Sequence, residues 1–375
     1  MLDTTFFRAC EAAAERWDVQ ALALGSDTRH ESTTFGLGCA PQARFLVASV
    51  TKPMTAALAL QLLDLDAPTS VWPEDVRVRH LLAHTTGFVS ELADLERFGD
   101  GDGALAAAVE ELPSLDRPFG VDEVWSYANS GYWLAGWLSA QAAGTSFEDA
   151  LTRHVFEPAG MTASGFDDEG YPRARRSSGG VVSNVPDLLA FARWLLDRPI
   201  FDAMRTVRGK PVAGVYGLGL FGRRIAGVDV WGHPGSYQTA KGSLLVVPAR
   251  AAMFVALATG SKGDRALRRL EELWLERLLG ERAVRPGCVE LSPAQLAAFA
   301  GRYANQQTQA TVAVDGARLH VDFLELVSGE RTVLEANPIG PATFEVLGGD
   351  FDGERFDFPR EGFARFGSRL CRRVA

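Results

Sequence analysis

The sequence predicts an α+β protein with a separate β module at its C-terminal end. Apolar segments typical of strands lie at both ends of residues 1–285, and a long helical stretch separates them, as in an α+β domain. After VRPGC (284–288), short alternating runs separated by Gly, Asp and Pro replace the helices. We therefore expect two domains, 1–285 and 286–375, with an antiparallel sheet or small barrel in the second.

The N-terminal segment has the pattern of an amphipathic helix. Its apolar residues recur at helical spacing, at Phe6, Phe7, Cys10, Ala14 and Trp17. Acidic residues interrupt it and it has no basic start, so it does not have the features of a signal peptide, and we expect a cytoplasmic protein. No run of about 18 apolar residues follows, so no membrane span or membrane partner is expected.

The remaining elements follow from hydrophobic periodicity and turn residues. Strands are expected at 19–25, 34–39, 215–221, 228–233, 242–248 and 251–259. Helices are expected at 74–86 (ending at Gly87), 103–112, 129–143, 146–154, 185–197 and 263–279. Alternating runs in the C-terminal module occupy 311–316, 317–323, 332–336, 343–347, 355–359 and 363–367.

Charge and cysteine content exclude several classes of function. Lys and Arg total 38 against 47 Asp and Glu, and the net charge of −9 disfavours nucleic acid as a partner. The four cysteines have no CxxC spacing, so we expect neither a disulfide framework nor a thiolate metal site. Only four residues are lysine, so a motif that contains one is less easily accidental.

The first candidate catalytic motif is Ser49-Val50-Thr51-Lys52. It precedes an apolar helix whose first turn must contain Pro53, which places Ser49 at the helix N-terminus. Residues three apart share a helix face, so the Ser49 hydroxyl and the Lys52 amine can meet. The helix N-terminus favours an alkoxide, and a desolvated lysine can act as a base. A capping serine and a solvated lysine would give the same four residues.

The second motif is Tyr127-Ala128-Asn129, on a short loop before an apolar helix. A phenol near a lysine can act as general base and then as general acid. Asn129 would project beside it and donate to a substrate carbonyl. A core tyrosine followed by a turn-forming asparagine is the structural alternative.

The third motif is His233-Pro234-Gly235-Ser236, within a predicted strand region. A glycine at a strand edge allows a substrate backbone to approach closely. The backbone N–H of Ser236 could pair with that of Ser49 as an oxyanion hole. A simple turn histidine is the alternative.

Together the motifs resemble those of the serine β-lactamase and penicillin-recognising family, within it the class C branch, with its D-aminopeptidases, DD-carboxypeptidases and family VIII carboxylesterases. That family carries S-x-x-K, then Y-x-N, then K-T-G or H-x-G, and the corresponding segments here are SVTK, YAN and HPG, about 75 and 105 residues apart. LLAHTTGF (81–88) and SSGGVVSNVPDLLAFARWLL (177–196) also match. The resemblance covers roughly residues 20–280.

The resemblance implies an antiparallel sheet flanked by helices, an all-helical lobe and a site in the cleft between them. The C-terminal module resembles the lipocalin-like β domains of some of these hydrolases. A Ser49 acyl-enzyme is implied, with Lys52 and Tyr127 as proton-transfer partners, either of which could be the base. The Ser49 and Ser236 N–H groups would hold the oxyanion.

Asn129, His233 and Gly235 would bind the substrate, but His233 stands where class C β-lactamases usually have lysine. A histidine is neutral or only partly charged near pH 7, so it binds a carboxylate less reliably. We therefore expect a serine hydrolase for small esters or amides, without cofactor or metal.

Four alternatives stay open: a β-lactamase, a D-aminopeptidase or DD-carboxypeptidase, an acyltransferase of the same fold, and a non-catalytic ligand sensor. A lactam is therefore also a possible substrate. The sequence does not decide the oligomeric state.

Overall fold

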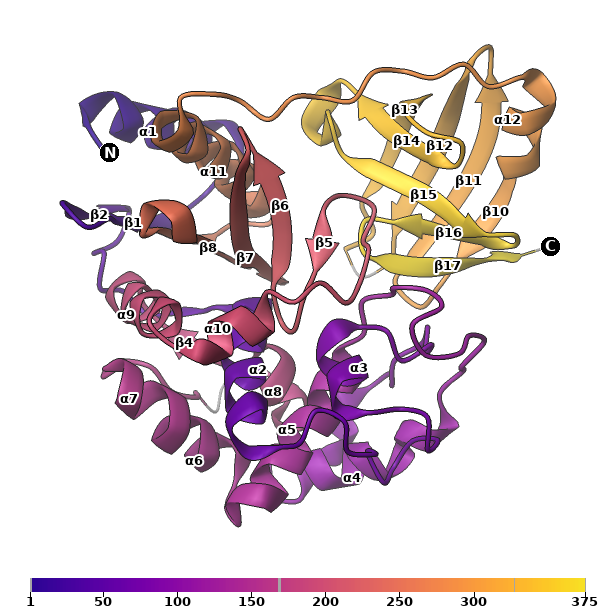
Figure 1. Cartoon of the computed structure of the whole chain (residues 1–375). Helices are drawn as coiled ribbons and strands as arrows, with labels where there is room; N and C mark the ends of the chain where they lie inside the picture. Colours follow the sequence, from indigo (N-terminus) through magenta and orange to yellow (C-terminus); the bar gives the residue numbers. More distant parts are fainter. Residues whose placement is uncertain (1, 168–169, 327, 375) are drawn as a thin grey trace.

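A seven-stranded antiparallel sheet, in the order β2-β1-β9-β8-β7-β6-β5, organises the first part of the chain (Figure 1). The structure is a computed structural model that describes residues 2–167, 170–326 and 328–374. The strands are β1 (Ala21–Asp27), β2 (Ser32–Leu37), β5 (Val215–Tyr216), β6 (Phe221–Ile225), β7 (Val228–Tyr237), β8 (Ala240–Val247) and β9 (Ala252–Thr259).

The strand expected at 215–221 is wrong as a single element, because it divides into β5 and β6. Gly219 has a φ of +82°, and a Cβ on Gly217 would lie 1.9 Å from the Met204 carbonyl oxygen. The two glycines therefore form a turn between the strands, a conformation that side-chain-bearing residues rarely adopt.

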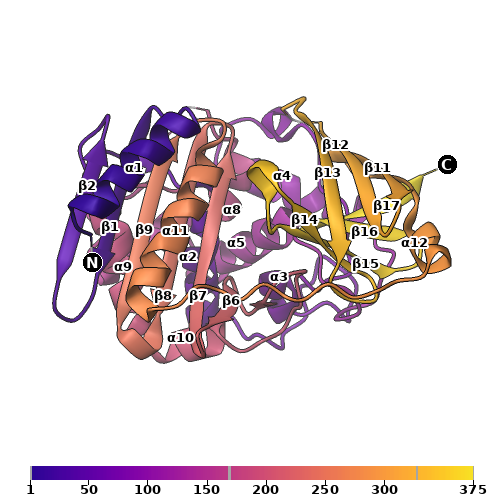
Figure 2. The ribbon, with the colours of Figure 1, turned by 90° about the horizontal axis from the view of Figure 1, so that it is seen from above.

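Two helices, α1 (Thr4–Arg16) and α11 (Gly263–Leu279), cover one face of the sheet (Figure 2). Trp274 of α11 stacks on Phe254 of β9 with ring centroids 5.2 Å apart. In α1, Phe6, Cys10 and Ala14 are buried as predicted, but Phe7 and Trp17 stay partly exposed. Each large side chain buried here contributes roughly 1.5–3 kcal/mol.

The opposite face of the sheet packs against a helical lobe (Figure 1). Its helices are α2 (Thr51–Leu62), α3 (Val78–Ala83), α4 (Ala104–Glu111), α5 (Asn129–Ala143), α6 (Phe147–Leu151), α7 (Glu157–Ala159), α8 (Arg176–Gly179), α9 (Val185–Leu196) and α10 (Pro199–Met204). Two short strands, β3 (Phe45–Leu46) and β4 (Val182–Ser183), pair with each other.

The helix expected at 74–86 is shorter than predicted. Pro68 forms a β-bridge with Arg77, so the chain does not become helical until α3. The helix ends at His84, whose left-handed φ of 59° stops it before Gly87.

The remaining short helical turns are 3₁₀ or π in type. They are η1 (Ala48–Val50), η2 (Leu95–Phe98), η3 (Leu112–Ser114), η4 (Thr152–Phe156), η5 (Arg173–Arg175), η6 (Pro248–Arg250) and η7 (Gly349–Phe351). Among the described residues, no helix is long and apolar enough to cross a membrane.

The C-terminal part is a closed antiparallel barrel with its own apolar core, as predicted. Its strands are β10 (Gly301–Ala304), β11 (Thr308–Asp315), β12 (Arg318–Glu325), β13 (Arg331–Pro338), β14 (Thr343–Leu347), β15 (Arg355–Arg360), β16 (Phe363–Phe366) and β17 (Arg369–Val374). Helix α12 (Pro293–Phe299) precedes them. We keep the domain boundary near residue 286, between α11 and α12, as a proposal.

Candidate active site

Ser49 lies in η1, directly before α2, at the helix N-terminus that the sequence predicts. The preceding residue, Ala48, has a left-handed φ of 48°. This conformation is uncommon for a residue with a Cβ and persists only where the surroundings hold it. The Val47 N–H donates to the Val181 carbonyl at 2.9 Å and so anchors the bend. The bend fixes the Ser49 position between β3 and α2.

Lys52, the second residue of α2, is fully buried and contacts Ser49. Its Nζ lies 3.0 Å from Ser49 Oγ, 2.7 Å from Asn129 Oδ1 and 2.7 Å from the Ser178 carbonyl oxygen. Burial lowers the pKa of Lys52 well below its ordinary value. Glu91 opposes that effect, while the positive charges of Arg369 and Arg175 add to it.

Tyr127, on the segment that leads into α5, lies beside both groups. The Lys52 Nζ is 4.8 Å from the centre of the Tyr127 ring. Burial raises the pKa of Tyr127 above its ordinary value, although a hydrogen bond with the Ser49 side chain acts in the opposite direction. The phenol therefore keeps its proton at neutral pH.

Asn129 is the first residue of α5, and both the oxygen and the nitrogen of its side-chain amide form hydrogen bonds. Its Oδ1 accepts from Lys52, and its Nδ2 donates to Glu91 Oε2 at 3.1 Å. The Asn129 backbone N–H also donates to the Glu91 carboxylate. Glu91 was not among the predicted site residues, because an isolated glutamate in a loop carries no motif.

The C-terminal barrel also reaches this site, through Arg369 of β17. Arg369 Nη1 donates to Glu91 Oε1 at 2.6 Å, and its guanidinium carbon lies 5.3 Å from the Tyr127 ring centre. The Tyr127 N–H donates to the Ser368 carbonyl at 2.9 Å. Sequence reasoning missed this contribution, because no local pattern links residue 369 to residue 127.

Strand β7 brings the third motif against the serine. A Cβ built on Gly235 would lie 2.2 Å from the Val47 carbonyl oxygen and 3.2 Å from Ser49 N. Only glycine fits at that separation without a shift of the backbone. The adjacent residue, Ser236, receives a 2.8 Å hydrogen bond on its Oγ from Lys241, on the neighbouring strand β8.

His233 is buried and neutral. Its Nδ1 lies 2.6 Å from the Pro234 carbonyl oxygen, so we assign the ring hydrogen to Nδ1. Burial, with a smaller contribution from Lys52, lowers the pKa of His233 to about 3. The centre of the His233 ring lies 5.2 Å from the centre of the Phe221 ring and 6.0 Å from that of Tyr127. His233 therefore adds no positive charge to the cleft near pH 7.

His80 and His84, which have a spacing compatible with metal binding, hydrogen-bond to the backbone instead. The His80 Nδ1 accepts from the Arg77 N–H at 3.0 Å, and the His84 Nδ1 accepts from the Ala128 N–H at 3.2 Å. In the part of the chain that the structure describes, no three His, Cys, Asp or Glu residues gather as a metal site.

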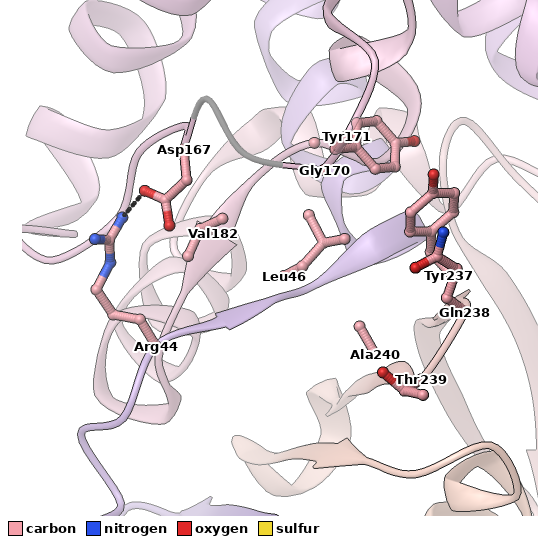
Figure 3. Close-up of a pocket in the computed structure, with 11 residues that line it drawn as sticks. Arg44, Leu46, Asp167, Gly170, Tyr171, Val182, Tyr237, Gln238, Thr239 and Ala240 are labelled. Atoms are coloured by element: carbon pink, nitrogen blue, oxygen red, sulfur yellow. Dashed lines mark hydrogen bonds and ion pairs between the residues drawn. The ribbon is translucent and has the colours of Figure 1, made fainter. Parts of the chain in front are cut away.

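A cavity of about 280 Å³ is lined by residues close in sequence to Ser49, Ser178 and Ser236 (Figure 3). Leu46, Gly180 and Tyr237 line it, and each is within three residues of Ser49, Ser178 or Ser236. Tyr171 and Tyr237 lie side by side at one end, with ring centres 4.8 Å apart. The lining residues are thus neighbours, along the chain, of residues that build the site.

Comparison with known sequences gives one family and several relatives. A family model described as Beta-lactamase matches residues 10–278. Penicillin-binding protein 4 of Amycolatopsis lactamdurans is 27% identical over an alignment of 252 residues, and the match covers 56% of this chain and 64% of that protein. The chain spans less than two thirds of the length of each of the curated relatives it was compared with.

Comparison with solved structures shows the same fold. SurE with D-Leu has a TM-score of 0.74 at 23% identity, and the match covers 99% of both chains. D-amino acid amidase from Ochrobactrum anthropi SV3, complexed with L-phenylalanine, has a TM-score of 0.64 at 17% identity, over 73% of this chain and 98% of that one. At these identities the likeness concerns the fold alone.

Proposed function

The chain belongs to the β-lactamase family of serine hydrolases, and on that premise we propose that it cleaves small esters or amides through an acyl-enzyme on Ser49. The observation that carries this proposal is the 3.0 Å contact between the buried Lys52 amine and the Ser49 hydroxyl. A hydroxyl becomes a nucleophile when an adjacent base accepts its proton.

In this proposal Lys52, as a neutral amine, is the base. A neutral amine has two N–H donors and one lone pair, and two of the three Lys52 neighbours are carbonyl oxygens that can only accept. Asn129 Oδ1 and the Ser178 carbonyl therefore take both N–H groups. The lone pair is left for the third neighbour, the Ser49 hydroxyl. The low pKa of Lys52 supports the same protonation state.

During acylation, protons move from Ser49 to Lys52, from Lys52 to Tyr127 and from Tyr127 to the leaving group. Ser49 Oγ attacks the substrate carbonyl carbon as its proton passes to Lys52. The backbone N–H groups of Ser49 and Ser236 stabilise the negative oxygen that forms. As the C–O or C–N bond breaks, protonated Tyr127 gives its proton to the leaving group and regains one from Lys52. Water reverses the sequence to release the acid.

We propose in addition that the acyl residue has D configuration. Two proteins of the same fold point this way: one was solved with D-Leu, and the other is named a D-amino acid amidase. Asn129, which retains one amide hydrogen beyond its bond to Glu91, would donate to the carbonyl of that residue. Gly235 and His233 would form the opposite wall.

The test is hydrolysis of the p-nitrophenyl esters of N-acetyl-D-leucine and N-acetyl-L-leucine. We expect release of p-nitrophenol by the wild type, with kcat/KM about tenfold or more in favour of the D ester. Ser49→Ala should lower the rate by about 10⁴-fold or more. Ser114→Ala, at an exposed serine whose hydroxyl donates to the Glu111 carbonyl at 2.7 Å, is the matched control. Equal rates for Ser49→Ala and wild type would exclude the mechanism.

A further inference from the structure

Three of the four residues Arg173–Arg176 are arginines, and they differ in their partners. Arg173 forms ion pairs with Glu148 at 3.2 Å and Asp102 at 2.6 Å. Arg176 pairs with Glu148 at 2.9 Å. Among the described residues, no carboxylate forms an ion pair with Arg175, which lies between them in the sequence.

Arg175 lies instead against the two tyrosines that line the cavity. Its guanidinium carbon is 5.1 Å from the Tyr171 ring centre and 5.2 Å from the Tyr237 ring centre. Its Nε is buried and has no hydrogen-bond partner among the described residues. The side chain as a whole stays partly exposed. Its backbone is fixed, because the Ser178 hydroxyl donates to the Arg175 carbonyl at 2.9 Å.

Three other basic groups near the serine are neutral or paired with a carboxylate, and a fourth, Lys241, donates to Ser236 Oγ and to the Gln238 carbonyl oxygen, each at 2.8 Å. His233 is neutral, and Arg369 is paired with Glu91 at 2.6 Å. Lys52 is neutral in the proposed mechanism. Burial is the main cause of its lowered pKa, and the Arg175 charge makes a smaller contribution in the same direction.

We propose that Arg175, packed against both Tyr171 and Tyr237, binds a carboxylate of the substrate. This inference rests on the proposed function and adds the substrate class: esters or amides that carry a carboxylate group. A planar guanidinium forms paired hydrogen bonds with a carboxylate, and the tyrosine rings keep it oriented. Arg175 thus supplies the positive charge that His233, in the place of lysine, does not.

The cavity beside Arg175 suits such a substrate. Figure 3 shows the apolar Leu46 and Val182 between the tyrosine end and the Arg44–Asp167 ion pair at the other end. Because Arg44 is already paired with Asp167, at 3.0 Å, it is not the group that binds the carboxylate. An apolar substrate body can lie in the middle, with its carboxylate at the tyrosine end.

Two pairs of esters test the proposal, and each pair differs only in a carboxylate against a carboxamide. On the acyl side these are the α-p-nitrophenyl esters of N-acetyl-D-glutamate and N-acetyl-D-glutamine. On the leaving-group side they are the N-acetyl-D-leucyl esters of 3-hydroxybenzoate and 3-hydroxybenzamide. The values of kcat/KM are measured for wild type, Arg175→Gln, Arg175→Lys and the matched control Arg173→Gln.

We expect wild type to prefer the carboxylate member of one pair by about tenfold or more, since hydrogen bonds between charged groups are among the strongest in proteins. Arg175→Gln should abolish this preference, measured as the ratio of kcat/KM for the carboxylate ester to kcat/KM for the carboxamide ester, because the loss of the Arg175 charge also acts on the pKa of Lys52 and so on both rates. Arg175→Lys should retain part of the preference, and Arg173→Gln all of it. The pair that responds shows on which side of the scissile bond the carboxylate lies.

Three results would overturn the proposal while the proposed function stands. The wild type could hydrolyse both members of each pair at equal rates. The preference could persist in Arg175→Gln. Arg175→Gln could also slow all four esters equally, which would indicate a structural role. If none of the esters acylates Ser49, the proposed function itself fails, and that outcome is distinguishable because none of the three leaving groups, p-nitrophenol, 3-hydroxybenzoate and 3-hydroxybenzamide, is released.

Discussion

At the scale of single residues, the proposed mechanism depends on the protonation state of Lys52. A base accepts a proton only when it is deprotonated, so the acylation rate should rise with pH through the pKa of Lys52. Burial holds that pKa well below the ordinary lysine value of about 10.4. The rate should therefore reach its plateau well below pH 10, measured by stopped-flow release of p-nitrophenol.

Lys52→Arg separates the two candidate bases. A guanidinium does not lose its proton in proteins, so this variant should acylate about 10²- to 10⁴-fold more slowly than wild type. Tyr127→Phe should be slow as well but should keep the dependence of rate on pH that belongs to Lys52. If Lys52→Arg acylates as fast as wild type, Tyr127 rather than Lys52 is the base.

Gly235 tests the close approach of β7 to the serine. Alanine at this position must displace the Val47 carbonyl, which lies 2.2 Å from the new Cβ. We expect Gly235→Ala to lower kcat by about 10²- to 10³-fold, the effect of losing an oxyanion donor. Gly101→Ala is the control, because its Cβ meets nothing within 4 Å. Full activity in Gly235→Ala would place the oxyanion hole elsewhere.

Part of the site was predictable from residue spacing. Ser49 and Lys52 share a helix turn, so their contact follows from the α-helix itself. The placement of Asn129 at the start of α5 follows from the polar segment before an apolar helix. Glu91 and Arg175 were not predictable, because their positions depend on loops whose conformation no local pattern specifies.

At the scale of elements, the hairpin formed by β16 and β17 contacts the segments that carry Glu91 and Tyr127. Removing Arg369 leaves the Glu91 carboxylate buried without its ion-pair partner. Breaking a buried ion pair in this way typically destabilises the folded state by about 3–5 kcal/mol. We expect Arg369→Met to lower the free energy of unfolding by a similar amount. It should also move the pH range in which the rate rises to higher pH, because the Arg369 charge then no longer opposes the effect of Glu91 on the pKa of Lys52.

The control for this prediction is Arg372→Met on the same strand. Arg372 pairs with Asp116 at 3.0 Å, but both side chains are more than half exposed. Its loss should change the free energy of unfolding by no more than about 1 kcal/mol, as for other surface pairs. The free energy of unfolding is measured with urea, and the rate is measured as a function of pH. Equal changes in both quantities for the two substitutions would contradict a special role for Arg369.

Secondary-structure elements were predictable where hydrophobic periodicity was strong. Six alternating runs correspond to β11–β16, but the runs for β10 and β17 were not recognised. Strand β10 has only four residues, and three arginines in β17, RLCRRV, obscure its alternation. A closed barrel supplies partners for both strands, so pairing rather than sequence preference determines them.

At the scale of the whole molecule, the Glu91 carboxylate makes stability depend on pH. Burial raises its pKa, but Arg369 and the hydrogen bonds from Asn129 outweigh burial, so the pKa is lower in the folded protein. A lowered carboxylate pKa contributes stability above the unfolded value of about 4.3, and this is lost as pH falls through the folded value. We expect Glu91→Gln to be less sensitive to pH between 5 and 3 than wild type, by urea unfolding. The same sensitivity in both would contradict this assignment.

The assembly of the site from two parts of the chain could not be inferred from the sequence. The periodicity of each part predicts its own core, and both cores are present. How the barrel docks depends on side chains such as Arg365, which donates to the Trp125 carbonyl at 2.7 Å while paired with Asp357. Such contacts join residues 240 apart in sequence.

The central claim is that Ser49 forms the acyl-enzyme, and intact-protein mass spectrometry tests it most directly. Wild type and Ser49→Ala are mixed separately with the p-nitrophenyl ester of N-acetyl-D-leucine and with a penicillin, and sampled over time. We predict a transient mass increase of one acyl group from the ester, on wild type alone. An adduct of equal yield on Ser49→Ala, or p-nitrophenol release by wild type without any adduct on rapid quenching, would contradict the account. A lasting penicillin adduct on Ser49 would still identify Ser49 as the nucleophile. It would favour a penicillin-binding peptidase over an esterase or amidase.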